Sequence, residues 1–320
     1  MHPSLSPTNI FAPVSTPAHS IVDLSHLVLM VTAAVFVVVF SLLAYAVVKF
    51  RDRRKNDGRE PAQVYGSIQV ELAWTVIPTL IVIVLFLATA RVIASIQNAV
   101  RPNNALEVTV IGHQFWWEYR YPSFNVVTAN ELHIPVSNPA HPTPTFLTLL
   151  SADTDHSFWV PRLAGKTDLI PNHSNSMWMD PYETGPYLGQ CAQYCGTQHA
   201  KMLLRVYVDS QEDFDRWIQA QSRPAHVAAN ASEGQRIFER TACVNCHAIA
   251  GTSAKGTFGP DLTHLMSRQT IAAGAARNTI GSLIAWIYNP AVIKPGSKMP
   301  AMGLSTAQAA AVAEYLVTLR

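Results

Sequence analysis

Two long segments near the start of the chain are apolar and carry no charged side chain. Residues 24–48 and 72–90 contain no Asp, Glu, Lys or Arg. A transmembrane helix needs roughly 20 such residues. The pattern therefore predicts two membrane spans, at about residues 24–48 and 72–96, within an N-terminal segment and membrane hairpin of residues 1–100.

The segment between the two spans is strongly basic. Residues 49–60 carry six Lys and Arg side chains. Because Lys and Arg are enriched in cytoplasmic loops, this loop is expected inside the cell and both ends of the hairpin outside. The chain is thus predicted to lie in an inner (plasma) membrane, with its remaining domains on the periplasmic or outer side.

Beyond residue 100 the pattern changes to short alternating stretches. In residues 106–110, Leu106, Val108 and Val110 alternate with polar side chains, as expected for a half-buried strand. Further strand candidates are residues 131–136, 145–152 and 202–210, and a helical pattern follows at 211–221. Residues 101–221 are therefore predicted to form an antiparallel β-sandwich.

The last part of the chain reads as helical. Residues 222–232 are small, polar and Pro-containing, which is typical of a linker. Within residues 233–320, helices are predicted near 279–290 and 305–319, the second with Ser305 as N-cap. This pattern predicts a small all-α domain.

Composition and charge distribution support the division into a membrane part and two soluble domains. The chain is 49% hydrophobic and 14% charged, which favours a membrane protein. Residues 101–221 carry 7 Lys and Arg against 12 Asp and Glu, a net charge of −5, whereas residues 233–320 carry 8 against 4, a net charge of +4. This distribution suggests two soluble units that attract each other, and not a nucleic-acid-binding protein.

Residues 189–202, GQCAQYCGTQHAKM, contain a dense group of soft ligands: Cys191, Cys195, His199 and Met202. A disulfide and a zinc site are two possible interpretations, but methionine is a poor zinc ligand. Thiolate, imidazole and thioether together on a β-sandwich loop favour copper. Two thiolates can bridge two copper ions, and His156 in 153-DTDHSFWVP-161 is a candidate for a second imidazole.

A second motif lies in the predicted helical domain. Cys243-Val-Asn-Cys246-His247 is the Cys-x-x-Cys-His signature of covalent haem c attachment, in which His247 becomes the proximal iron ligand. A thioredoxin-like redox pair is the alternative, but no βαβ pattern surrounds the motif. A second axial ligand is expected, and Met299 and Met302 are both candidates.

These motifs, the membrane hairpin and the aromatic run 112-GHQFWWEYRYP-122 resemble subunit II of cytochrome c oxidase with a fused cytochrome c domain, as in caa-type bacterial haem–copper oxidases. The resemblance implies a cupredoxin-like sandwich with a dinuclear copper A centre. It implies these ligands: Cys191 and Cys195 bridging the coppers, His156 and His199 binding one each, Met202 as a weak ligand, and the backbone carbonyl of Gln193.

The resemblance also assigns roles outside the two motifs. Glu71 matches a family glutamate at the mouth of a proton channel, and Phe115, Trp116 and Trp117 match the family's electron-transfer aromatics. Two positions depart from the family pattern. Phe115 stands where tryptophan is usual, and Gln193 replaces a glutamate that reaches magnesium, so no magnesium ligand is expected there. Resemblance to cytochromes c favours Met299 over Met302 as axial ligand.

The implied function is electron transfer from haem c to copper A and on to subunit I, where oxygen is reduced to water with proton translocation. The chain has no oxygen-reducing centre, so it is expected to act as an enzyme subunit. Subunit I, subunit III and a soluble cytochrome or other electron donor are expected partners. The alternatives are a subunit of a copper-A-containing nitric oxide reductase and a membrane-anchored copper carrier.

Opposite net charges suggest how the two redox domains would meet. A linker of about a dozen residues would hold them at millimolar local concentration. The basic haem domain would then rest transiently on the acidic copper domain, and high salt would slow electron transfer between them.

Overall fold

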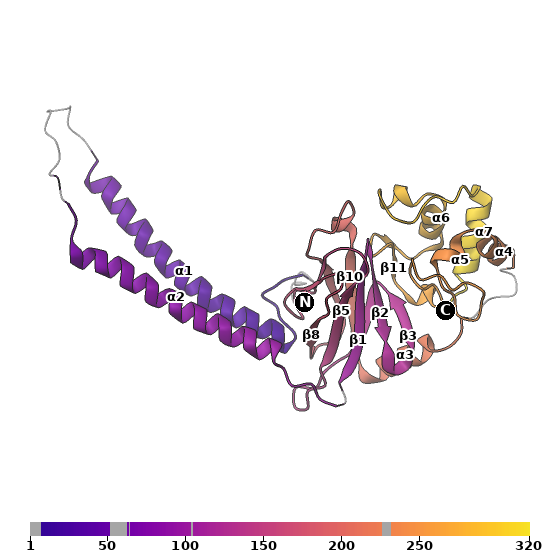
Figure 1. The fold of residues 1–320 in the computed structure, drawn as a ribbon, viewed down its shortest axis with the longest axis horizontal. Coiled ribbons are helices and arrows are strands. Elements are labelled where there is room, and N and C mark those ends of the chain that lie inside the picture. Colours follow the sequence, from indigo (N-terminus) through magenta and orange to yellow (C-terminus); the bar gives the residue numbers. More distant parts are fainter. Residues whose placement is uncertain (1–7, 52–62, 64, 104, 226–231) are drawn as a thin grey trace, which may run out of the picture. The chain divides into compact units, whose positions relative to one another are not determined.

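The computed structural model describes residues 8–51, 63, 65–103, 105–225 and 232–320 (Figure 1). The chain forms two units: residues 20–99, and residues up to 19 together with 100–320. Most of the basic loop that predicts the membrane orientation lies outside the described residues. The same holds for residues 226–231 of the predicted linker.

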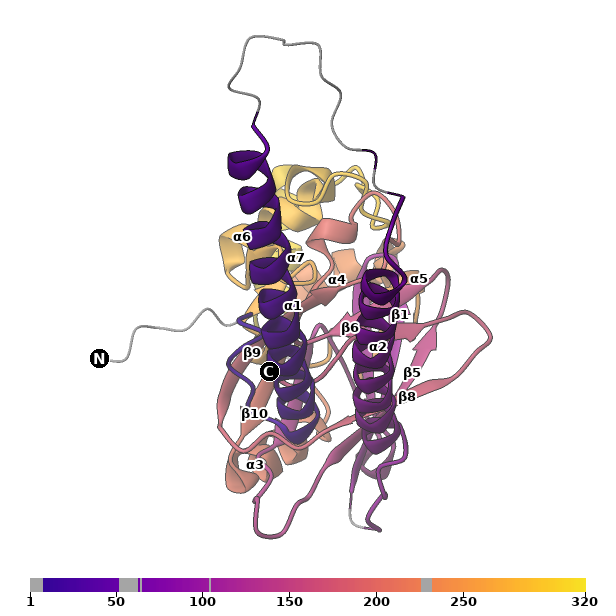
Figure 2. The ribbon, with the colours of Figure 1, turned by 90° about the vertical axis from the view of Figure 1, so that its left-hand side faces the viewer.

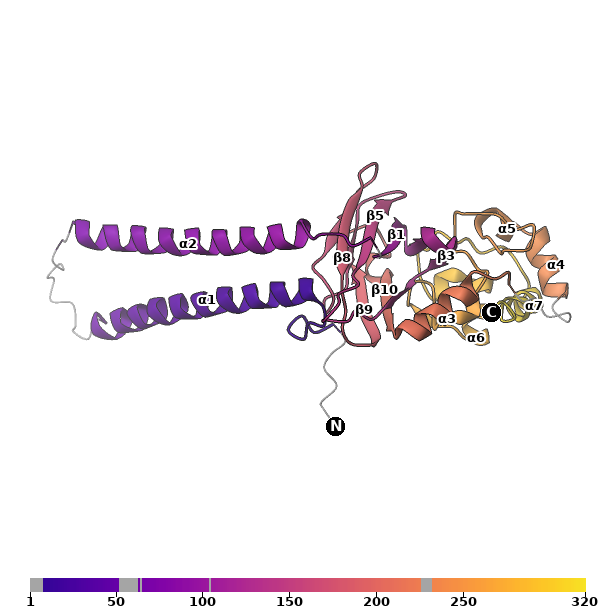
Figure 3. The same cartoon turned by 90° about the horizontal axis from the view of Figure 1, so that it is seen from below.

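Two long helices dominate the first unit and run side by side (Figures 2 and 3). Helix α1 spans Thr16–Lys49 and α2 spans Ile68–Gln97, and both are long and apolar enough to cross a membrane. Their apolar side chains are largely exposed, which is unfavourable in water and suits a lipid environment. The two predicted spans lie inside these helices.

Residues 106–209 form a sandwich of two five-stranded sheets (Figure 1). One sheet has the order β3-β2-β1-β5-β8 and the other β4-β10-β9-β6-β7. The strands are β1 Leu106–His113, β2 Trp116–Tyr121, β3 Val126–Ala129, β4 Glu131–Pro135, β5 Thr145–Ser151, β6 His156–Trp159, β7 Thr167–Leu169, β8 Asn175–Met179, β9 Gly185–Cys191 and β10 Leu203–Asp209. Helix α3, Gln211–Gln221, follows the last strand, with Ser210 accepting a hydrogen bond from the Asp213 backbone as N-cap.

The sandwich is confirmed, and its core follows the predicted alternation. Val108 and Val110 are buried between the sheets with large aromatic residues such as Trp117 and Phe158. The strand pairing differs from a purely antiparallel arrangement, because β1 pairs with β5 and β4 pairs with β10 in parallel. The sheets are therefore mixed.

The C-terminal domain is built from short helices, as predicted. They are α4 Ser232–Arg240, α5 Cys243–Cys246, α6 Ile280–Tyr288 and α7 Thr306–Leu316, and a two-residue strand pair, β11 Thr270–Ile271 with β12 Ala276–Arg277, lies between α5 and α6. Single 3₁₀ turns occur in this domain at Leu265–Ser267 and Pro290–Val292, and in the sandwich domain at Pro122–Phe124 and His199–Lys201. Ser305 caps α7 in a full capping box with Gln308, which confirms the predicted N-cap.

Helices α4 and α7 pack closely against each other in this domain. At Gly234, an added Cβ would lie 1.9 Å from the Ala311 carbonyl oxygen, so only glycine permits the approach. Phe238 and Tyr315 pack edge to face across the same contact, with ring centroids 5.9 Å apart. The two helices are therefore in close contact within the core of this domain.

Candidate metal and haem sites

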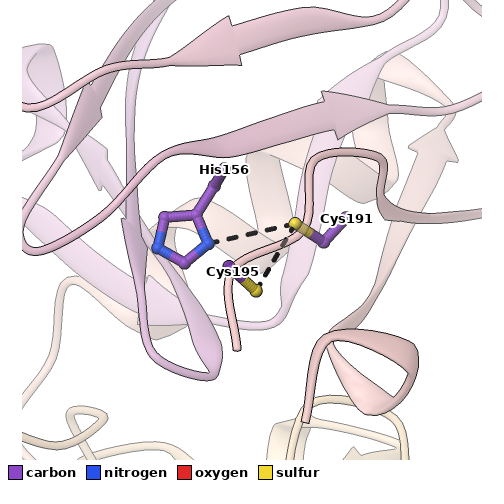
Figure 4. Close-up of side chains that lie close together, drawn as sticks. All are labelled: His156, Cys191 and Cys195. Carbon is purple, nitrogen blue, oxygen red and sulfur yellow. Dashed lines mark hydrogen bonds between the residues drawn. The ribbon is translucent and has the colours of Figure 1, made fainter. Parts of the chain in front are cut away.

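Three predicted copper ligands point toward one another inside the sandwich (Figure 4). The ligand atoms of His156, Cys191 and Cys195 all lie within 4.8 Å of one another, and all three residues are buried. The two sulfurs are 3.9 Å apart, and Cys191 Sγ is 3.9 Å from His156 Nδ1. This is a compact group of soft ligand atoms shielded from water.

The other predicted ligands complete the group. Cys195 Sγ lies 3.7 Å from His199 Nδ1 and 3.8 Å from Met202 Sδ. Cys191 Sγ lies 3.2 Å from the Gln193 carbonyl oxygen. The structure therefore brings together every residue that the sequence predicts at the copper site.

The donor set distinguishes between the possible interpretations of the cluster. The sulfur separation of 3.9 Å is far beyond the ~2.05 Å of a disulfide bond, and both cysteines are free. A thioether beside two thiols and two imidazoles suits copper better than zinc. The residues present fit a copper centre.

The ligand loop is held by the ends of three strands. His156 begins β6, Cys191 ends β9, and Met202 directly precedes β10. The Cys191 N–H donates to the Met202 carbonyl at 3.0 Å and closes the loop. Gly196, at φ +129°, makes the turn, and an added Cβ would sit 3.1 Å from the Phe115 ring. Main-chain hydrogen bonding and a glycine turn therefore fix the shape of the ligand loop.

The two thiols influence each other's ionisation. The contact with Cys195, together with the hydrogen bond to His156, lowers the pKa of Cys191 to about 3. The same contact with Cys191, reinforced by burial, raises the pKa of Cys195. Two thiolates this close repel each other unless a cation neutralises them, since a coordinating metal ionises its thiol ligands. The pair thus suits ions placed between the sulfurs.

Asp153 orients the first imidazole. His156 Nε2 lies 2.8 Å from Asp153 Oδ1, which leaves Nδ1 facing Cys191. Burial opposes the charged imidazolium, but the hydrogen bonds to Asp153 and Cys191 raise the pKa of His156 overall. Metal-binding histidines are commonly fixed by such a carboxylate on the second ring nitrogen.

Two of the three predicted aromatic residues lie at the ligand cluster. Trp117 is fully buried, with its ring centroid 6.0 Å from that of His156. Trp116 stacks on His113 with ring centroids 4.1 Å apart. Phe115 is buried against Gly196. The structure thus places Phe115 and Trp117 next to the ligand cluster and Trp116 against His113, and the role of all three in electron transfer stays a prediction.

The Cys-x-x-Cys-His motif forms a single helical turn beside a cavity. Cys243 and Cys246 are the first and last residues of α5, and His247 follows. His247 Nδ1 donates to the Pro260 carbonyl at 2.7 Å, which leaves Nε2 as the free ring nitrogen. At Gly259 an added Cβ would lie 2.6 Å from His247 Cε1, so glycine lets this segment pack on the imidazole.

A cavity of about 500 Å³ adjoins this motif. Its walls include Cys243, Cys246 and His247, and also both predicted axial methionines, Met299 and Met302. This volume lies in the range of cofactor sites. The thiols, the oriented imidazole and the two thioethers on one cavity fit a haem.

Glu71 lies in the first turn of α2 and belongs to the helical unit. Its role in proton entry stays a prediction.

Two contacts of Gln114 beside the ligand cluster were not predicted from the sequence. The Gln114 side-chain amide donates to the Cys195 carbonyl at 2.5 Å, and its backbone N–H donates to Asp153 at 2.6 Å. Gln114 and Asp153 both lie in stretches that carry the family resemblance, but nothing in their spacing indicates that they meet. They meet because β1–β2 and the strand before His156 are neighbours in the sandwich.

Comparisons with known proteins agree with these sites. Three family profiles match in order: "Cytochrome C oxidase subunit II, transmembrane domain" over residues 6–92, "Cytochrome C oxidase subunit II, periplasmic domain" over residues 139–208, and "Cytochrome c" over residues 231–320.

Curated relatives resemble nearly the whole chain. The chain is 33% identical over 319 residues to cytochrome c oxidase subunit 2 of Alkalihalophilus pseudofirmus, covering 96% of this chain and 90% of the relative. It is 30% identical to that of Bacillus sp., covering 85% and 80%, and 28% identical to that of Bacillus subtilis, covering 99% and 92%. With its two apolar helices, sandwich and cytochrome c domain, the chain belongs to the cytochrome c oxidase subunit II family.

Proposed function

We propose that this chain passes electrons from a covalently bound haem c to a dinuclear copper A centre and on to subunit I, where oxygen is reduced to water with proton translocation. Its family makes it a subunit of an oxidoreductase in the inner membrane, with its redox domains outside. One observation carries the electron-transfer step. The haem cavity and the ligand cluster share a wall, because Gln114 and Asp153 line the cavity and also contact Cys195 and His156.

The copper centre would be held by the buried cluster described above. Cys191 and Cys195 would bridge the ions, His156 and His199 would each bind one, and Met202 and the Gln193 carbonyl would complete the set. A bound copper pair would supply a carrier for one electron shared over both ions. The protein holds the ligands in a closed loop, orients His156 through Asp153, and excludes water by burial of the cluster.

Haem c would be attached through Cys243 and Cys246, with His247 as one axial ligand. Met299 is proposed as the other and Met302 as the alternative, since both line the cavity. Apolar residues packed around this cavity keep water away, as is usual when a haem potential is set by burial and by axial ligands.

The remaining assignments follow from family membership. We take residues 1–100 as N-terminal segment and membrane hairpin, 101–221 as copper domain, 222–232 as linker and 233–320 as cytochrome c domain. Subunit I in the membrane is the proposed acceptor, with subunit III beside it and a soluble cytochrome or other donor supplying haem c. Glu71 is proposed as a proton entry point for subunit I.

The test is purification of the chain with its partner subunits, followed by optical and EPR spectra and an oxygen-uptake assay. We expect a haem c spectrum, the multi-line EPR signal of mixed-valence copper, and oxygen uptake. Both spectra without oxygen uptake would contradict the oxidase assignment and favour a nitric oxide reductase. Absence of the copper signal in a metal-replete preparation would contradict the copper centre itself.

Asp153 offers a sharper test of the copper site. Replacing it with asparagine is expected to weaken copper binding by roughly 10–100-fold, because loss of a carboxylate that orients a histidine ligand has that effect in other metal sites. Asp155→Asn is the matched control, since Asp155 is an exposed carboxylate in the same loop. Copper affinity is measured by competition with a chelator, and equal affinities in the two variants would contradict the role of Asp153.

A further inference from the structure

The copper domain and the cytochrome c domain meet along a defined surface. The turn between β11 and β12 presses on the copper domain, where Ala273 is fully buried against Trp116 and Ala129. The Leu203 N–H, from the start of β10, donates to the Ala273 carbonyl at 3.2 Å. This main-chain hydrogen bond joins the start of β10 in the copper domain to the hairpin turn of the cytochrome c domain.

This turn has an unusual backbone. Ala272 and Ala273 both have positive φ, 54° and 56°, and Gly274 has φ +81°. Such a conformation is unfavourable for alanine and persists where surrounding contacts hold it in place. At Gly274 an added Cβ would lie 3.0 Å from Leu203 Cβ. The turn is shaped to fit the copper-domain surface.

Glu131 is the first polar anchor of this surface. It is 2% exposed, and its carboxylate accepts hydrogen bonds from the Gln269 N–H at 2.8 Å, the Thr270 N–H at 2.9 Å and the Thr270 hydroxyl at 2.6 Å. All three donors belong to the cytochrome c domain. A buried carboxylate is costly without such partners, so separation of the domains would have to expose Glu131 to water.

Lys294 is the second anchor. It belongs to the cytochrome c domain and contacts the copper domain, whereas Glu131 belongs to the copper domain. It is 3% exposed, and its Nζ donates to the Phe115 carbonyl of the copper domain at 2.8 Å and to the Ala272 carbonyl of the hairpin at 3.1 Å. Lys201 adds a bond from the copper domain to the Ile293 carbonyl at 2.9 Å. One buried lysine thus joins the aromatic run to the hairpin turn.

Ion pairs do not hold this surface together. Every ion pair found among the described residues joins side chains of the same domain. The interface consists of buried hydrogen bonds and apolar contacts, which salt screens far less than exposed charges. The opposite net charges of the two domains therefore do not describe how they meet.

The docked arrangement closes the haem cavity against the copper domain. Its walls include His113, Phe115 and Trp116 along with the Cys-x-x-Cys-His motif. Trp116 is 9% exposed. The copper-domain aromatics face the haem cavity and are covered from solvent by the cytochrome c domain.

We infer that Glu131, Lys294 and the β11–β12 hairpin form a latch that holds the cytochrome c domain in one docked position, from which electrons reach the copper domain without a salt-sensitive encounter. The latch itself stands on the contacts above. Its consequence for electron transfer rests on the proposed function.

Hydrogen exchange in the purified complex tests the latch without reference to electron transfer. Glu131→Gln is expected to speed exchange of the Gln269 and Thr270 amides by roughly 10–100-fold, since hydrogen bonds to a charged group contribute about 1.5–3 kcal/mol. Glu212→Gln, at an exposed glutamate of α3, is the control and should change nothing. Equal exchange in the two variants would overturn the latch.

A matched pair at Thr270 separates the hydroxyl contact from general damage. Thr270→Val keeps the shape and removes the hydroxyl donor to Glu131, whereas Thr270→Ser keeps the donor. We expect faster exchange of residues 269–271 in the valine variant and near-normal exchange in the serine variant, with an unchanged haem spectrum in both. Identical exchange in the two variants would contradict the role of the hydroxyl.

The rate of haem-to-copper transfer tests the consequence. In the unmodified complex it is expected to be constant from low to high ionic strength. Lys294→Met is expected to lower the rate and make it salt-dependent, whereas Lys255→Met, at an exposed lysine of the same domain, should leave it unchanged. A rate in the unmodified complex that falls with salt would overturn the inference. Protected amides without any electron transfer would instead refute the proposed function and leave the latch intact.

Discussion

Replacing Cys195 with serine is expected to eliminate the mixed-valence copper signal and to lower electron delivery to subunit I by more than about 100-fold. The reason is the central place of this sulfur, which lies 3.9 Å from Cys191 Sγ, 3.7 Å from His199 Nδ1 and 3.8 Å from Met202 Sδ. Loss of groups that only orient a ligand costs about 10–100-fold in affinity or activity, so loss of a bridging ligand should cost more.

EPR spectroscopy and the rate of copper reduction by haem c measure this effect. Tyr194→Phe is the matched control, because Tyr194 lies in the same loop but is 74% exposed. Its spectrum and rate should be those of the unmodified protein. A multi-line copper signal that survives in the Cys195→Ser variant would show that this cysteine does not bridge two coppers.

The second large effect is expected when the haem-attachment cysteines are removed. A chain with both Cys243→Ala and Cys246→Ala should carry no covalent haem, and its cytochrome c domain should not fold stably. The cavity of about 500 Å³ would then lack its cofactor. The apolar side chains around this cavity would then face water instead of a cofactor, which is unfavourable in proportion to the apolar area exposed.

Haem staining after denaturing electrophoresis measures covalent attachment, and proteolysis measures folding of residues 233–320. Ser253→Ala, at an exposed position in the same domain, should keep both haem and protease resistance. The EPR signal of the proposed copper centre should persist in the double variant, because all of its proposed ligands come from the sandwich domain. Haem that remains attached to the double variant would disprove the assigned attachment site.

The sequence predicts local features well. Alternating residues such as Val108 and Val110 identify strands because one face of each sheet is buried. The copper loop is predictable because Cys191, Cys195, His199 and Met202 lie within twelve residues of one another, so their convergence needs only one loop. Ser305 is predictable as a cap because its partner Gln308 is three residues away.

Features that depend on distant segments were not predictable in this way. The parallel pairing of β1 with β5 joins residues nearly forty positions apart, and periodicity within each strand carries no information about its neighbour. The contact of Gln114 with Cys195 has the same origin, since it spans 81 positions. Such contacts follow from the topology of the sandwich.

Net charge does not identify the contacts between the two soluble domains. Counting acidic and basic residues suggested that the two soluble domains attract each other through exposed charge. Glu131 and Lys294 contribute to those counts, but both are buried, and they bind backbone groups of the opposite domain instead of ions. A residue count does not distinguish a buried charge with hydrogen-bond partners from a solvated one.

The latch consists largely of main-chain groups, and this has a consequence for how the protein can vary. The N–H groups of Gln269, Thr270 and Leu203 and the carbonyls of Phe115 and Ala272 are present with any side chain at those positions, except that proline would remove an N–H. Amino-acid changes at most of the contact surface therefore leave its hydrogen bonds in place. A cytochrome c domain exchanged from a relative should dock correctly if the glutamate, the lysine and the shape of the hairpin turn are kept.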